Sequence, residues 1–153
     1  MAEVDRGAGV MFPPPLVFLG VALIGPVIDR LLGLPTLPIP GWLSLAFLLP
    51  GFILIGIAIG LFRQRGENPV PSTPTAGVID TGIYARTRNP MYLGMAIAYP
   101  GVAILLQSMP SLLLLPVAII MINTQVIARE ERYLEAKFGA AFVAYKARVR
   151  RWL

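Results

Sequence analysis

Two residue types are missing from this chain of 153 residues, which contains no cysteine and no histidine. Their absence excludes disulfide bonds, thiolate nucleophiles and zinc sites built from Cys or His ligands. Without an imidazole, any proton transfer must use a carboxylate, a tyrosine, a lysine, water or the substrate itself. The sequence predicts no metal site.

Charge is also scarce, because charged residues make up 14% of the chain and hydrophobic residues 56%. A soluble domain usually has about a quarter of its residues charged. The uncharged residues gather in long runs, which is typical of an integral membrane protein. The net charge of +5 does not indicate nucleic-acid binding, since the basic residues flank apolar runs and suit anionic lipid headgroups there.

We therefore expect an all-α membrane bundle that forms a single domain over residues 1–153. A proline triplet at 13–15 suits the start of the first helix, because proline fits the first turn and not the interior. Residues 107–111 predict the turn of an antiparallel hairpin formed by the last two spans. The predicted spans are about 14–30, 41–62, 90–107 and 111–128.

Two further features refine this picture. Gly56 and Gly60 form a small-xxx-small pair, which would allow close approach of another helix. From residue 129 the chain becomes amphipathic, which predicts a C-terminal helix lying in the membrane interface. With four spans, Arg30 alone among the thirteen Lys and Arg residues lies on the far side, so both termini are expected to be cytoplasmic.

A polar cluster stands where the third span begins. Tyr84, Arg86, Arg88, Asn89 and Tyr92 precede or open an uncharged block that runs from residue 89 to 128. One interpretation is ordinary flanking, in which arginine reaches the interface, tyrosine lies in the aromatic belt, and an Asn-Pro pair opens the helix. The other is a binding site.

Glu130 and Glu131 favour the binding site, because the positive-inside rule does not explain two acids at the end of a span. Residues seven apart lie near one face of a helix, which places Asn123 above Glu130 and Thr124 above Glu131. A line of polar groups along a membrane helix should face the bundle interior or a cavity. The alternative is a surface salt-bridge cluster.

The hairpin would bring the Arg, Asn and Tyr cluster beside the two glutamates at the water–lipid boundary. Such a pocket could hold a zwitterionic or charged cofactor while a lipophilic substrate enters from the bilayer. A glutamate suits an ammonium group and an arginine suits a carboxylate.

These motifs resemble a known family. The segment from Thr81 to Gly94, the apolar hairpin, the run from Glu130 to Leu134, the pair Phe138-Gly139 and Tyr145 resemble the isoprenylcysteine carboxyl methyltransferases. Wider relatives of that family include the phospholipid methyltransferases. The resemblance covers about residues 60–153.

The resemblance implies an integral membrane enzyme that uses S-adenosylmethionine, with a cofactor region at about 82–153. Asn89 stands where many members have histidine, so hydrogen bonding carries over to this position and a proton role does not. The catalytic residues implied are Arg88, Tyr92 and Glu131. The cofactor site would comprise Tyr84, Arg88, Asn89, Pro90, Tyr92, Asn123, Glu130 and Glu131.

The expected reaction is methylation of a carboxylate on an isoprenylcysteine-like lipid, in a prokaryotic inner membrane. Methylation of a phospholipid or another amine is the first alternative. A membrane reductase with a nicotinamide cofactor and a non-enzymatic membrane protein are the others. The expected partners are a lipophilic or lipidated substrate and membrane lipids, without nucleic acid, and the oligomeric state is left open.

Overall fold

Proline marks the beginning of most helices in the computed structural model, which describes residues 8–10, 12–70 and 73–153. Pro14 opens α1 (Pro14–Leu32) and Pro90 opens α3 (Pro90–Leu105), as the sequence predicts. Both are positions where a missing backbone N–H leaves no hydrogen bond unmade. A 3₁₀ turn, η1 (Gly41–Ser44), leads directly into α2 (Leu45–Gln64).

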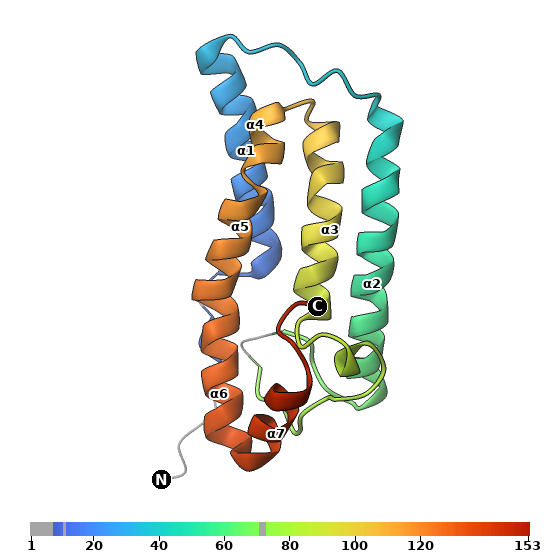
Figure 1. Cartoon of the computed structure of the whole chain (residues 1–153), viewed down its shortest axis with the longest axis vertical. Helices are drawn as coiled ribbons and strands as arrows, with labels where there is room; N and C mark the ends of the chain where they lie inside the picture. The colour runs from blue at the N-terminus through green and yellow to red at the C-terminus, as the bar shows by residue number, and fades with distance from the viewer. Residues whose placement is uncertain (1–7, 11, 71–72) are drawn as a thin grey trace.

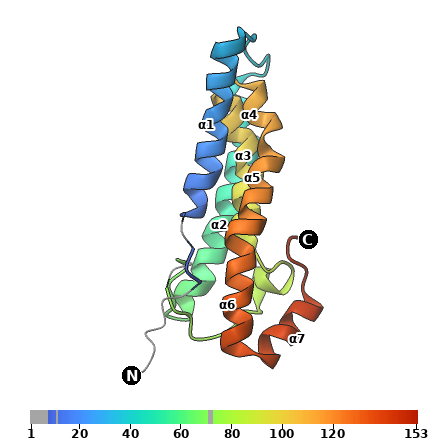
Figure 2. The ribbon, with the colours of Figure 1, turned by 90° about the vertical axis from the view of Figure 1, so that its left-hand side faces the viewer.

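The helices run side by side along the long axis of the molecule (Figures 1 and 2). α2 packs chiefly against α3, whereas α1 packs against α3 and the two short helices α4 (Met109–Leu113) and α5 (Leu115–Met121). In the orientation of Figure 1, residues 33–40 and 106–108 meet at the upper end, where Leu37 N donates to Gln107 O over 2.9 Å. Residues 65–70 and 73–89, between α2 and α3, lie at the lower end and are called the loop 65–89 below.

Close packing of α2 on α3 depends on two facing glycines. A Cβ added to Gly94 would lie 2.7 Å from the carbonyl oxygen of Gly51, and one added to Gly51 would lie 2.6 Å from that of Gly94. No larger residue fits between two backbones this close. Gly56 and Gly60, whose spacing would allow close approach of another helix, make no such contact, because a Cβ there would have nothing within 4 Å.

The segment predicted as a fourth span is irregular. After α4 and α5 the chain continues through η3 (Ile122–Ile127), which has π-helical geometry, into α6 (Ala128–Phe138). Gly139, at φ 52°, then turns the chain sharply into α7 (Ala140–Arg148). The π-helical turn matters for the site, since it changes which side chains after it face the bundle.

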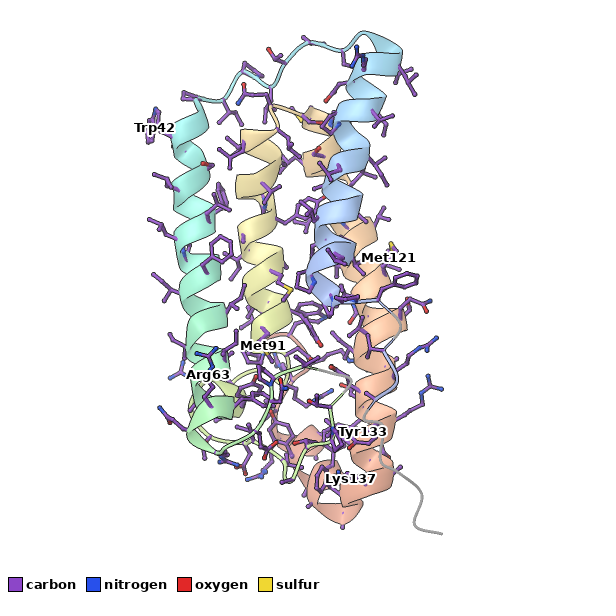
Figure 3. The ribbon with its side chains drawn as sticks, turned by 180° about the vertical axis from the view of Figure 1, so that it is seen from behind. Trp42, Arg63, Met91, Met121, Tyr133 and Lys137 are labelled. Atoms are coloured by element: carbon purple, nitrogen blue, oxygen red, sulfur yellow. The ribbon has the colours of Figure 1, made fainter. Side chains whose placement is uncertain are left out.

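Among the described residues, two helices are long and apolar enough to cross a membrane: α1, with a mean hydropathy of 1.8, and the η1–α2 unit Gly41–Gln64, with 2.6. Only 11% of the η1–α2 window is buried, so this helix is not the core of a soluble fold. Exposed Trp42 and Arg63 lie at its opposite ends (Figure 3). α3 is shorter, and the four-span count stays a prediction.

The C-terminal part differs from a single interfacial helix. Phe142, Tyr145 and Val149 are buried and pack with Val78, Leu134 and Phe138. The apolar side of α7 thus faces the protein rather than lipid. This burial brings the C-terminal residues back under α3 at the lower end (Figure 1).

Candidate functional site

A cavity of about 130 Å³ lies at the lower end of the bundle, between the start of α3, α6, α7 and the loop 65–89. Met91 and Tyr133, which contribute to its wall, are labelled in Figure 3. Its lining combines apolar side chains with about as many that carry a polar group. The polar and charged side chains are Asn68, Thr73, Thr75, Tyr84, Arg88, Asn89, Tyr92, Glu130, Glu131, Tyr133 and Tyr145.

Glu131 is clamped between two arginines. Arg88 Nη2 donates to Glu131 Oε1 over 2.8 Å, and Arg151 binds both carboxylate oxygens through Nε and Nη2. Burial alone would raise the pKa of Glu131, but the hydrogen bonds from Arg151 and Arg88 outweigh it and hold that pKa below its ordinary value. Glu131 is therefore ionised, and its oxygens are already engaged.

The C-terminal main chain is held against the start of α3. Arg88 N donates to Arg150 O over 3.0 Å, and the Asn89 side-chain amide donates to Arg151 O over 2.9 Å. The Thr87 hydroxyl donates to the same Arg151 oxygen, while Arg88 Nη1 donates to the carbonyls of Val149 and Lys146. The 87–89 segment thus fixes the path of residues 149–151.

Glu130 has a different environment from its neighbour. Its Oε1 accepts a hydrogen bond from Tyr92 OH over 2.7 Å, and no cation pairs with it among the described residues. Burial raises the pKa of Glu130 to about 7, and the hydrogen bond from Tyr92 only partly offsets this. Glu130 is thus a desolvated carboxylate on the cavity wall that lacks a positive partner.

Two buried donors on the cavity wall have no acceptor in the part of the chain that the structure describes. They are the hydroxyl of Tyr84 and Nε of Arg88. Burial raises the pKa of Tyr84, so its phenol keeps its proton and can donate. Buried donors without partners are uncommon, and here both belong to residues that line a cavity where a ligand could supply an acceptor.

The structure brings seven of the eight predicted cofactor residues to this cavity: Tyr84, Arg88, Asn89, Pro90, Tyr92, Glu130 and Glu131. Asn123 does not line it, and its Oδ1 instead accepts from Trp152 Nε1 over 3.1 Å. Thr124 is exposed and bonds back to Ile120 O over 2.9 Å. The seven-residue spacing fails because the π-helical turn η3 contains both residues.

Several residues at the site were not expected from the sequence. No local pattern links Arg151 to Glu131, because the contact depends on the turn at Gly139. Phe142 lines the cavity as well. The helical spacing of the apolar residues at 138, 142 and 145 indicates that Phe142 is buried, but it does not indicate that Phe142 lines a cavity.

Comparison with known proteins bears on this site. The family model described as phospholipid methyltransferase matches residues 51–141, which include most of the cavity wall. A protein of Haemophilus influenzae that carries the name uncharacterized protein is 43% identical over 63 residues, or 41% of this chain and 79% of that protein. No solved structure gives a significant match.

Proposed function

The chain belongs to the phospholipid methyltransferase family, and we propose that it transfers the methyl group of S-adenosylmethionine to a lipophilic acceptor that reaches the cavity from a membrane. One observation carries this proposal beyond family membership. Within the part of the chain that the structure describes, the cavity is lined by a carboxylate without a cationic partner and by two residues with buried, unpartnered donors. These are the groups that a zwitterionic ligand would engage.

The residues present fit the amino-acid part of the cofactor. Glu130 would hold its ammonium group, because this carboxylate has no cationic partner of its own. Arg88 Nε and the Tyr84 hydroxyl would hold its carboxylate, which would give both buried donors an acceptor. When bound, the cofactor supplies a methyl group already activated on a sulfonium, so positioning and exclusion of water are what the protein must add.

The acceptor is either a carboxylate, as expected from the isoprenylcysteine resemblance, or an amine. Among the described residues that line the cavity, Arg88 is the only cation, and its two Nη atoms are engaged by Glu131 and by main-chain carbonyls. A carboxylate acceptor would find no second cation there. An amine acceptor needs no cation to bind and could pass its proton to water, which favours an amine such as a phospholipid headgroup.

Apolar residues offer a route for the lipid part of either acceptor. Phe62 at the end of α2 and Met91 at the start of α3 both line the cavity. These helices are the closely packed pair, and the outer surface of α2 is largely exposed and apolar. A lipid lying against them would reach the polar wall head first.

The test is a transfer assay with methyl-labelled S-adenosylmethionine and the full-length protein in detergent micelles. One reaction contains phosphatidylethanolamine and another a farnesylated cysteine derivative. Label that resists alkaline hydrolysis identifies N-methylation, whereas label released as methanol identifies a methyl ester. A folded protein that transfers label to neither lipid, and binds neither S-adenosylhomocysteine nor a nicotinamide dinucleotide, would contradict an enzymatic role; binding of the dinucleotide alone would favour the reductase.

A further inference from the structure

Arg151 reaches the cavity only through other residues. Its guanidinium binds Glu131, and Glu131 in turn binds Arg88 over 2.8 Å, but Arg151 is not part of the cavity wall. The Glu131 side chain is 9% exposed and that of Arg88 10%, whereas Arg151 is 39% exposed, so the bridge runs from the protein surface to a buried guanidinium. A connected chain of charged groups therefore runs from the C-terminal segment to the cavity.

Arg88 is held in one orientation by this chain. Nη2 is fixed by Glu131, and Nη1 is fixed by the carbonyls of Val149 and Lys146. Only Nε is left, and it is buried without a partner in the described structure, on a residue that lines the cavity. Because a guanidinium is planar, fixing both Nη atoms also fixes the direction in which the Nε–H points.

From this geometry we propose that Arg151 is a positioning residue, which aims the Nε–H of Arg88 at the carboxylate of the bound cofactor by holding Glu131. The proposal rests on the proposed function, since it needs a ligand with a carboxylate. The proposal also assigns different roles to the two glutamates. Glu131 belongs to the positioning chain, and Glu130 is the carboxylate that meets the ligand.

The proposal makes a prediction that a merely structural role does not. Loss of Arg151 should weaken binding of ligands that carry the amino-acid carboxylate and leave ligands without it unaffected. S-adenosylhomocysteine has this carboxylate, whereas 5′-methylthioadenosine keeps the nucleoside and the thioether but lacks the whole amino-acid part. Arg150→Gln is the matched control, because the Arg150 side chain is exposed and makes no ion pair in the described structure.

The experiment is isothermal titration of the full-length protein in detergent with both ligands. Arg151→Gln should weaken S-adenosylhomocysteine binding at least tenfold, or ~1.4 kcal/mol, and change 5′-methylthioadenosine binding less than about twofold. Arg150→Gln should change neither. Equal weakening of both ligands, or no weakening of either, would overturn the proposal. A folded wild-type protein that does not bind S-adenosylhomocysteine would instead refute the proposed function itself.

A double-mutant cycle gives a second, independent measurement with S-adenosylhomocysteine alone. If Arg151 acts only through Glu131, the Arg151→Gln/Glu131→Gln double variant should bind no more weakly than Glu131→Gln. Additive losses would show that Arg151 acts by another route and would also overturn the proposal.

Discussion

Glu130 combines a desolvated position with the absence of a cationic partner, and this makes it the residue whose ionisation should control binding. The groups that face it are Tyr92 from α3, Tyr84 from η2 (Gly82–Ala85) and Glu131 on its own helix. None of these supplies a positive charge. A ligand ammonium would therefore meet an attractive charge only when Glu130 is ionised.

The sign of the pH dependence follows from the raised pKa of Glu130, which burial moves to about 7. Below that pH the carboxyl is protonated and neutral, so binding of S-adenosylhomocysteine should weaken as the pH falls from 8 to 6. Glu130→Gln should bind at least tenfold more weakly at pH 8 and show little change with pH. Titrations at several pH values measure both effects.

Glu135→Gln is the matched control for that series. Glu135 lies on the same helix, but its side chain is 46% exposed and pairs only with exposed Lys146. The variant should keep the affinity and the pH profile of the wild type. A wild-type affinity that does not vary between pH 6 and 8 would count against Glu130 as the ligand for the ammonium group.

Part of the arrangement of the site residues could be predicted from the sequence, as Arg88, Glu130 and Glu131 show. Their meeting was predictable, because an uncharged block of this length must fold back and return its charged ends to one surface. The distinction between the two glutamates was not. It depends on Arg151, whose position is set by the backbone turn at Gly139 and by hydrogen bonds from residues 87–89.

At the scale of the helices, the pair α2 and α3 supports the cavity from above, and its spacing is fixed by Gly51 and Gly94. Gly94→Ala should destabilise the protein by about 1–3 kcal/mol, because the added Cβ would lie 2.7 Å from a backbone oxygen that cannot move freely. Unfolding in mixed detergent micelles, followed by far-UV circular dichroism, measures the loss.

Gly56→Ala on the same α2 helix is the control for that variant. Its Cβ would meet nothing within 4 Å, and alanine is the better helix former by up to about 1 kcal/mol. We expect this variant to be as stable as the wild type or slightly more stable. Equal destabilisation by both substitutions would show that the contact at Gly94 does not determine the packing.

Helix positions followed from proline and apolar runs, but the helix contacts did not. Gly56 and Gly60 have the spacing of a packing motif, yet the contact forms at Gly51 and Gly94 on facing helices. The spacing of small residues within one helix cannot specify which face its neighbour covers. That choice is made by the whole bundle, including the loop connections.

For the whole molecule, the distribution of charge favours a membrane orientation with the cavity on the cytoplasmic side. Arg30 lies in α1 near the upper end, while the arginines of the site lie at the lower end (Figure 1). The chain has no cysteine, so single-cysteine variants can report sidedness without background. Exposed positions suitable for this are Thr36, Ala76 and Met109.

If four segments span the bilayer, Thr36→Cys and Met109→Cys should react with an impermeant maleimide added outside intact spheroplasts. Ala76→Cys should react only after the membrane is opened. Labelling of Thr36→Cys from outside without labelling of Met109→Cys would contradict the four-span prediction, and it would also contradict the contact between Leu37 and Gln107. Labelling of Ala76→Cys from outside would contradict the proposed orientation of the cavity.

The π-helical turn η3 has a consequence for how this chain can change over generations. A turn closed by i→i+5 hydrogen bonds holds one residue more than an α-turn, and that surplus sets where Glu130 and Glu131 point. Deleting the exposed Thr124 should abolish ligand binding while leaving the helix content unchanged. Thr124→Ala should change neither the binding nor the helix content. Titration measures the binding, and circular dichroism measures the helix content.

Loss of a single codon within residues 122–127 would turn every later side chain by about 100° around the helix axis. Tyr92 would then face a different residue, and the ion pairs of Arg88 and Arg151 would lose their shared carboxylate. Substitutions in this stretch leave the residue count intact. Natural selection should therefore tolerate many exchanges of amino acid there while removing nearly every change of length.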